Sequence, residues 1–130
     1  GADGVQVGSR FAASIESSSH NNFKETIVST IEGGTQLTLK ELAPVRLIKN
    51  KFYQDVQDLY QKCPSKEELV QLLGRARAKR GMFEGDLEEG ELEIGQVAGL
   101  IHEILPVKQI VQQMIAEFES ASKEKITFEF

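Results

Sequence analysis

A short β-branched segment opens the chain and leads directly into a glycine turn, and this opening constrains the fold more than any other part of the sequence. Residues 1–10 read Gly-Ala-Asp-Gly-Val-Gln-Val-Gly-Ser-Arg. The stretch 4–8 is short, β-branched and bounded by glycine, which suits a central parallel strand. Such a strand needs neighbours on both sides, and no later segment resembles a set of them. We therefore expect the chain to be the C-terminal piece of a larger α/β protein.

The composition argues against several classes of function. The net charge of −5 disfavours nucleic acid as the main partner, because phosphate binding requires clustered Lys and Arg. The basic stretch 75–80 is followed at once by the acidic stretch 84–93. No apolar run approaches the roughly 18 residues that suggest a membrane span. The single Cys63 cannot form an internal disulfide, which predicts a reducing, cytoplasmic location.

The first half of the chain is predicted to hold two helices and a pair of strands. Residues 9–16 suit a short helix, and Asn21 or Asn22 can cap a second one that ends at the glycines 33–34. The apolar positions of this second helix are Phe23, Ile27, Val28 and Ile31. Alternation over 35–39 and the apolar run 45–48 predict a two-stranded pair.

From Asn50 onward the chain is predicted to be almost wholly helical. One apolar stripe runs from Phe52 to Tyr60, and residues 65–68 form a capping box for the helix that follows. The apolar face of that helix is Leu69, Leu72, Leu73 and Ala76. Residues 81–90 have the character of an acidic loop, and residues 94–104 have helical spacing. Pro106 begins a last helix, whose stripe we expect to be core: Val107, Ile110, Val111, Met114, Ile115 and Phe118.

The junction after the opening segment is the strongest candidate for a binding site. A strand that ends in Gly8 and begins a helix directs several backbone N–H groups the same way, while Ser9 adds a hydroxyl and Arg10 a positive charge. A helix N-terminus favours an anion, and glycine lets it approach the backbone. In TIM barrels the phosphate site is often built from the loops after the seventh and eighth strands. The residues alone leave two interpretations open, a phosphate cradle or a tight turn.

Residues 1–11 closely resemble the last barrel strand and phosphate loop of a family of FMN-dependent TIM-barrel enzymes. This family contains nitronate monooxygenase (2-nitropropane dioxygenase) and enoyl-acyl-carrier-protein reductase II. The likeness continues through Glu16, His20, Pro44-Val-Arg46, Asn50 and Gly85-Asp86 to Gly95-Gln-Val-Ala-Gly-Leu-Ile101. The chain departs from the family at Leu42, where a glycine is expected, and at Ser9, which replaces a more usual Thr and keeps the hydroxyl.

The resemblance implies an α/β fold, the C-terminal part of an FMN-binding TIM barrel. Residues 1–32 would form the last barrel strand, the phosphate loop and the following helix, and residues 33–130 a mostly α-helical cap subdomain. The FMN phosphate would be held by Gln6, Val7, Gly8 and Ser9. Weaker cofactor contacts would come from Arg10, Gly95 and Gln96, and Ile94 would form part of the substrate-side wall.

The resemblance also implies what the chain lacks. The family's catalytic histidine and the first seven strands precede Gly1, so we expect no catalytic residue here and no activity from the chain alone. A single strand cannot close a barrel, so the N-terminal remainder of the barrel is the expected partner. A homodimer stays open. Neither His20 nor His102 has a second ligand at metal-binding spacing, and no metal site is expected.

Two classes of function remain open at this stage. In the first, an FMN-dependent oxidoreductase uses NAD(P)H to reduce an enoyl thioester on acyl carrier protein, in fatty acid biosynthesis. Nitronate monooxygenase, acting on a small alkyl nitronate, is the alternative within the family. In the second class, the apolar stripes beyond Asn50 form a non-catalytic helical interaction module. That hypothesis leaves the opening segment unexplained. Between the two family activities, the general character of the cap favours the enoyl reductase, although the pocket that discriminates them lies mostly before Gly1.

Overall fold

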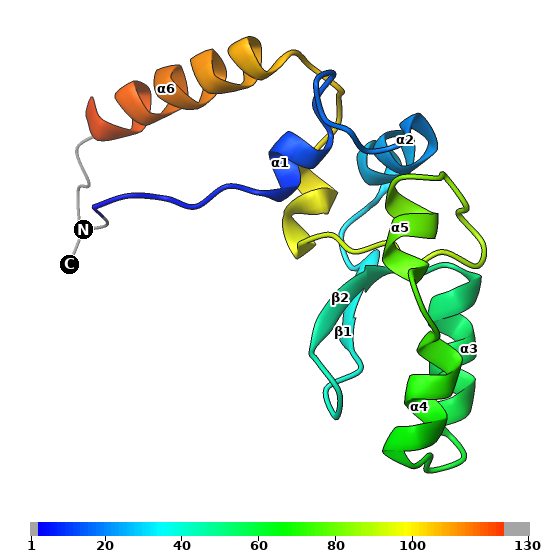
Figure 1. Cartoon of the computed structure of the whole chain (residues 1–130). Coiled ribbons are helices and arrows are strands. Elements are labelled where there is room, and N and C mark those ends of the chain that lie inside the picture. Colours follow the sequence, from blue (N-terminus) through cyan, green and yellow to red (C-terminus); the bar gives the residue numbers. More distant parts are fainter. Residues whose placement is uncertain (1–2, 124–130) are drawn as a thin grey trace, which may run out of the picture.

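The computed structural model describes residues 3–123 of the chain. Its elements, in chain order, are α1 (Ser9–Ala12), α2 (Asn21–Ser29), β1 (Thr35–Thr38), β2 (Val45–Ile48), α3 (Lys51–Tyr60), α4 (Lys66–Leu73), α5 (Arg77–Met82), the 3₁₀ helix η1 (Gln96–Leu100) and α6 (Val107–Lys123) (Figure 1). The body of the molecule lies around the strand pair and α2 to α5. From it, α6 and the opening segment project together to one side.

The two strands pair as the sequence predicts. β1 and β2 are antiparallel, with Thr35 opposite Ile48 and Thr38 opposite Val45. The other edge of β2 is also used, because the N–H of Ile48 donates to the carbonyl of Leu92 over 3.0 Å. The N–H of Ile94 likewise donates to the carbonyl of Arg46 over 3.1 Å. Residues 92–94 therefore lie against the free edge of β2, and this contact fixes the segment that follows them.

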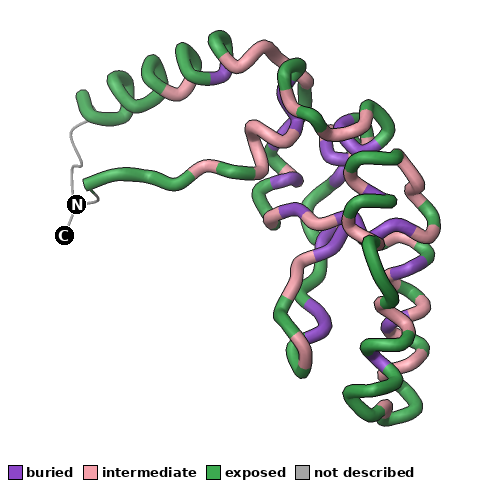
Figure 2. Tube along the Cα trace, in the orientation of Figure 1, coloured by how far each residue is buried: buried purple, intermediate pink, exposed green. Residues whose placement is uncertain are grey.

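Two clusters of buried side chains form the core (Figure 2). The first joins α2, η1 and the edge segment through Ala13, Phe23, Ile27, Ile48, Leu92, Ile94, Ala98 and Ile101. The second lies between the strand pair, α3 and α4, and consists of Leu39, Leu47, Phe52, Val56 and Leu69. The segment 94–96, which the sequence places near the cofactor, is therefore held by the first cluster, which contains Leu92, Ile94, Ala98 and Ile101.

The predicted capping box on α4 is confirmed. The N–H of Glu68 donates to Ser65 Oγ over 3.3 Å, and the carboxylate of Glu68 accepts from the N–H of Ser65 over 2.8 Å. The predicted cap of α2 was wrong, since His20 Nδ1 accepts from the N–H of Asn22 and takes the N-cap position. The same helix ends at Ser29, so Ile31 lies outside it and is 76% exposed.

The region from 76 to 104 differs most from the sequence-based expectation. Ala76 adopts a left-handed conformation with φ of 61° and separates α4 from α5, so it is not on the α4 face. Residues 81–90 are a loop only in part, because Gly81 and Met82 complete α5. The helix expected over 94–104 is reduced to η1. Ile94, Ala98 and Ile101 are nevertheless buried, whereas Val97 is 45% exposed.

The opening segment is not a strand in this chain. Residues 3–7 run as an irregular segment with no assigned strand, and Val5 is 82% exposed. A strand requires neighbours to satisfy its N–H and C=O groups, and the described part of the chain supplies none beside it. The predicted helix over 9–16 is correspondingly short, because α1 stops at Ala12.

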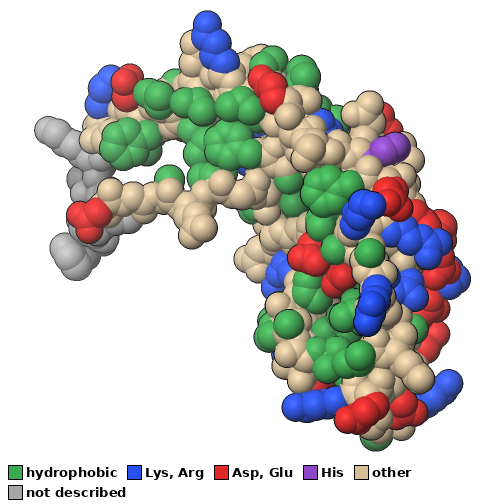
Figure 3. Space-filling model, in the orientation of Figure 1, with side chains coloured by type: hydrophobic (Ala, Val, Ile, Leu, Met, Phe, Trp, Pro, Cys, Tyr) green, Lys and Arg blue, Asp and Glu red, His purple; other side chains and the backbone are tan. Residues whose placement is uncertain are grey.

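The apolar stripe of α6 is largely uncovered. Ile110 is buried, whereas Val111, Ile115 and Phe118 are 39%, 53% and 72% exposed. Figure 3 shows the hydrophobic side chains gathered along this arm of the molecule. The expectation that the whole stripe is core was therefore wrong for this chain, since only the first turns of the helix meet the body.

Candidate functional site

The two most specific sequence motifs meet in space. The backbone N–H of Gly95 donates a hydrogen bond of 3.0 Å to Ser9 Oγ, across 86 residues of sequence. A Cβ placed on Gly95 would lie 2.7 Å from the same oxygen, so only glycine allows this approach. The segment against the edge of β2 is thereby fastened to the glycine loop at the start of α1.

A cleft of about 430 Å³ opens where these motifs meet. Its walls are Gly8, Ser9, Ala12, Pro44, Val45, Arg46, Glu93, Ile94 and Gly95. Four of the residues proposed from the sequence therefore share one cleft, namely Gly8, Ser9, Ile94 and Gly95. The segment 44–46 joins them there, although the sequence analysis gave it no role. Its contribution follows from the pairing of β2 with residues 92–94, which a local pattern does not reveal.

The loop at the start of α1 has the donors that a phosphate group needs. Ser9 Oγ accepts from Gly95, which leaves its own O–H free to donate. The N–H groups of Ser9 and Arg10 belong to the first turn of α1 and have no carbonyl partner inside the helix. A Cβ placed on Gly8 would meet no atom within 4 Å, so the backbone there faces open space. These residues fit a phosphate monoester.

The remaining predicted cofactor residues lie elsewhere. Val7 and Arg10 line a separate cleft against α6, and Arg10 Nη1 donates to the carbonyl of Glu103 over 3.1 Å. Gln96 lines a third cleft beside Thr35. Gln6 is exposed on the opening segment. In this chain the structure thus brings together the glycine loop and Ile94-Gly95, but not Gln6, Val7, Arg10 or Gln96.

A family model of nitronate monooxygenase matches residues 1–117. The chain belongs to the nitronate monooxygenase family. Among solved structures, it is similar to FabK from Thermotoga maritima, an enoyl-acyl-carrier-protein reductase II of the same family, at 36% identity and a TM-score of 0.84. A methionine-to-alanine mutant of that FabK matches at 37% identity and a TM-score of 0.77. The comparison with curated proteins finds no match.

The matches cover 95% of this chain but only 39% and 36% of the two FabK chains. The chain therefore spans under two fifths of the length of these relatives. The similarity is to a TIM-barrel protein. The resemblance read from residues 1–11 and 95–101 is confirmed at the level of the family.

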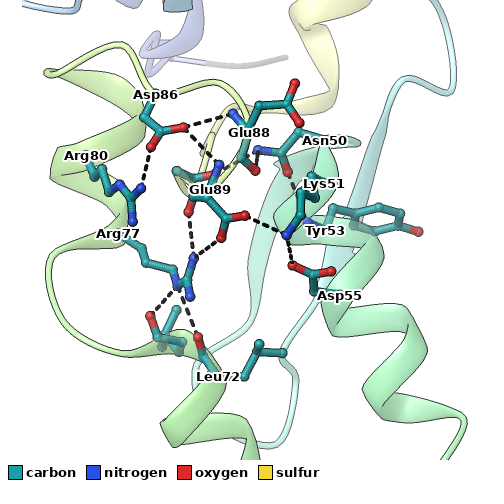
Figure 4. Close-up of polar contacts among 12 residues, drawn as sticks. Asn50, Lys51, Tyr53, Asp55, Leu72, Arg77, Arg80, Asp86, Glu88 and Glu89 are labelled. Carbon is teal, nitrogen blue, oxygen red and sulfur yellow. Dashed lines mark hydrogen bonds and ion pairs between the residues drawn. The ribbon is translucent and has the colours of Figure 1, made fainter.

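Asn50, one of the residues shared with the family, holds the loop that leads into the cleft (Figure 4). Its side-chain amide donates to the carbonyls of Leu87 and Gly90, both over 2.8 Å, and to that of Glu88 over 3.3 Å. Its Oδ1 accepts from the N–H of Tyr53 and caps α3. One side chain thus begins a helix and binds three carbonyls of the neighbouring loop.

An ion-pair network completes this attachment (Figure 4). Glu89 pairs with Lys51 of α3 and with Arg77 of α5, and the hydrogen bond from Lys51 holds the pKa of Glu89 below its usual value. Arg77 also donates to the carbonyls of Leu73 and Glu89 over 2.8 and 2.7 Å. The guanidinium lies 4.5 Å from the ring centre of Phe52, at the distance of a cation–π contact. The loop is consequently tied to α3, α4 and α5 before it reaches β2.

Glu91 follows this network and is almost fully buried, with 8% of its surface exposed. Burial raises its pKa to about 7, and the nearby Glu93 adds to the rise while Arg77 opposes it. Its backbone packs against α5, because a Cβ on Gly81 would lie 2.7 Å from the carbonyl oxygen of Glu91. The glycine inside α5 is what permits this close packing.

Metal ligands are not grouped in residues 3–123: no three His, Cys, Asp or Glu side chains there are placed to hold an ion. None of the helices in that range combines the length and apolar character required to cross a membrane.

Proposed function

We propose that this chain is the C-terminal part of an FMN-dependent oxidoreductase that reduces an enoyl thioester on acyl carrier protein with NAD(P)H. The observation that carries the proposal is the match to FabK, with 36% identity over 95% of the chain and a TM-score of 0.84. The contact between Ser9 and Gly95 supports it, because this contact joins the two motifs most specific to the family.

In this proposal, residues 3–8 are the last strand of the barrel and α6 is the barrel helix that follows it. The return of α6 alongside the opening segment supports the assignment, since Val7 and Arg10 share a cleft with Ile110 and Met114. The exposure of Val5 and Phe118 supports it as well, because the other barrel strands and helices would cover both. Residues 9–106 then form an insertion between strand and helix, and α6 belongs with the barrel rather than with the cap.

The glycine loop would hold the flavin through its phosphate. Gln6 and Val7 would contribute backbone groups, and Gly8 and Ser9 the open backbone and the free hydroxyl already described. When bound, the flavin supplies hydride transfer between NAD(P)H and substrate. Ile94 would form an apolar wall beside the reacting groups, and Gly95 would hold that wall against the loop. The catalytic acid and the remaining contacts would come from the N-terminal remainder of the barrel.

Nitronate monooxygenase activity is the second candidate, and the description of the matching family model favours it. The helical interaction module is set aside, because the family match begins at residue 1 and includes the glycine loop that this hypothesis left unexplained.

The test uses the complete protein, including whatever precedes Gly1. A yellow protein that oxidises NAD(P)H only when an enoyl-acyl-carrier substrate is present supports the proposal. Oxygen uptake with an alkyl nitronate and no enoyl reduction would support the second candidate. A colourless protein without either activity, even after flavin is added, would refute both.

A further inference from the structure

Arg46 lies between two clefts. One is the cleft at the glycine loop, and the other has a volume of about 590 Å³. The second cleft is lined by Glu32, Gly33, Thr35, Arg46, Gln96, Val97, Gly99 and Leu100. The end of the Arg46 side chain belongs to the second cleft, because Nη1 lies 3.3 Å from Thr35 Oγ1 and 3.4 Å from the carbonyl oxygen of Thr35.

The guanidinium of Arg46 has no negative partner in residues 3–123. No carboxylate there lies within 4.0 Å of it, and Glu32, at the exposed rim of the cleft, is beyond that distance. Its two polar contacts are with neutral oxygens and are long for hydrogen bonds. A guanidinium has five N–H donors, so most of them remain available. A half-buried cation without a negative partner is stabilised when an anion binds beside it in the cleft.

The polar contacts of the Arg46 side chain among residues 3–123 are with Thr35 and not with the glycine loop. The backbone of Arg46 is paired with Ile94, while its guanidinium lies next to Thr35. Thr35 and Gln96 line the second cleft, whereas Gly8 and Ser9 line the first. The guanidinium therefore contacts a residue of the second cleft, which Gly8 and Ser9 do not line. An anion bound by it belongs to a different part of the ligands than the phosphate held by Ser9.

We propose that Arg46 binds a phosphate group of the second ligand of the enzyme, in the cleft between Thr35 and Gln96. The inference rests on the proposed function. Arg suits this task because its planar fork binds two phosphate oxygens at once. Two ligands of the proposed reaction carry such a group, the nicotinamide dinucleotide and the phosphopantetheine arm of the acyl thioester. The exposed amide of Gln96 is a further donor at the same cleft.

The direct test measures binding to the complete protein by calorimetry. The probes are inorganic pyrophosphate, the adenosine bisphosphate that forms the end of NADPH, and phosphopantetheine. Arg46→Gln is expected to weaken binding of at least one probe by about ten- to a hundredfold, as for a lost charge-assisted contact. Arg46→Lys, which keeps the charge but not the fork, is expected to lie between. Arg75→Gln, an exposed arginine between α4 and α5, is the control and leaves binding unchanged.

The probe that is lost identifies the source of the phosphate. Loss of pyrophosphate or adenosine bisphosphate binding assigns the cleft to the dinucleotide, and loss of phosphopantetheine binding assigns it to the thioester. The KM of the corresponding ligand should rise by a similar factor, with kcat and flavin content close to those of the wild type. If Arg46→Gln does not fold, the KM of Arg46→Lys at an unchanged melting temperature decides the matter.

Two results would overturn the inference. One is that the wild type binds no probe, or that Arg46→Gln binds every probe as tightly as the wild type. The other is that Arg46→Gln loses flavin while the KM values stay within twofold, which would assign Arg46 to the flavin. Failure of the proposed function is a separate result, because it appears as a wild type without flavin or turnover. Binding of the probes requires neither bound flavin nor turnover, so the two failures can be told apart.

Discussion

The backbone nitrogen of Gly95 lies 3.0 Å from the hydroxyl oxygen of Ser9, and this contact joins the two ends of a stretch of 86 residues. Because Ser9 Oγ accepts from Gly95, its own O–H remains available to donate to a ligand. The position of the loop therefore depends on the segment that carries Ile94. A substitution at Ser9 should affect the segment that carries Gly95, and a substitution at Gly95 should affect the glycine loop.

Ser9→Ala is expected to weaken flavin binding by about tenfold, because it removes one donor to a charged phosphate and the acceptor for Gly95. Ser9→Thr keeps both functions of the hydroxyl and is the matched control, with an affinity near that of the wild type. Titration of the apoprotein with FMN, followed by flavin fluorescence, measures the difference. Equal affinities for Ser9→Ala and Ser9→Thr would contradict the assignment of the loop.

Asn50→Ala should lower the free energy of unfolding by roughly 2–4 kcal/mol, since it removes a helix cap and the amide that donates to the carbonyls of Leu87 and Gly90. Asn50→Ser keeps an N-cap acceptor but does not replace the amide donors. The expected order of stability is wild type, then Asn50→Ser, then Asn50→Ala. Urea denaturation measures it, and equal stability of Asn50→Ser and the wild type would show that the carbonyl contacts contribute little.

Gly90→Ala is expected to be strongly destabilising, by several kcal/mol or by failure to fold. A Cβ at this position would overlap the Cα of Gly81 and the carbonyl oxygen of Asp86, and neither is a flexible side-chain end. Gly4→Ala is the control, because its Cβ would meet no atom within 4 Å. Melting temperatures of the two variants provide the comparison. A Gly90→Ala protein as stable as Gly4→Ala would mean that the two backbones are farther apart than described.

Glu91 predicts a specific dependence of stability on pH. Its pKa is raised from 4.5 to about 7 in the folded protein, so the folded state holds this proton more tightly than the unfolded state. The contribution of Glu91 is therefore most favourable below pH 4.5 and is lost as the pH rises toward 7. Relative to Glu91→Gln, the wild type should lose stability between pH 5 and pH 8. Denaturation at both pH values tests this, with the exposed Glu25→Gln as a comparison variant.

Local patterns predicted the elements whose signals are local. The strand pair at 35–38 and 45–48 follows from alternation and β-branching, and the cap at Ser65 follows from a three-residue spacing. The last turn of α5 was missed because it contains Gly81, a residue that usually weakens a helix. Glycine is required here because the backbone of Glu91 packs against it. A contact between segments distant in sequence cannot be predicted from the local pattern of either segment.

The candidate site was predictable in its chemistry and only partly in its assembly. The glycine loop with Ser9 and the segment at Gly95 were identified by resemblance, but their hydrogen bond depends on how residues 92–94 pair with β2. Arg46 entered as part of a family segment, and only the strand pairing places it at two clefts. The exposed stripe of α6 has no partner surface among residues 3–123, and helical periodicity alone does not reveal whether such a surface exists.

The two ends of the long segment between the glycine loop and α6 lie side by side. Ser14 and Leu105 form a parallel bridge, the N–H of Ile15 donates to the carbonyl of Leu105 over 3.0 Å, and the carboxylate of Glu16 accepts from the N–H of Val107. Insertions are tolerated where their two ends lie close together. Residues 17–104, the part of the proposed insertion 9–106 that lies beyond these contacts, therefore begin and end at neighbouring points of the fold. We expect that replacing this segment with that of another family member changes the cleft walls contributed by Ile94 and Arg46 while Gly8, Ser9 and α6 keep their places.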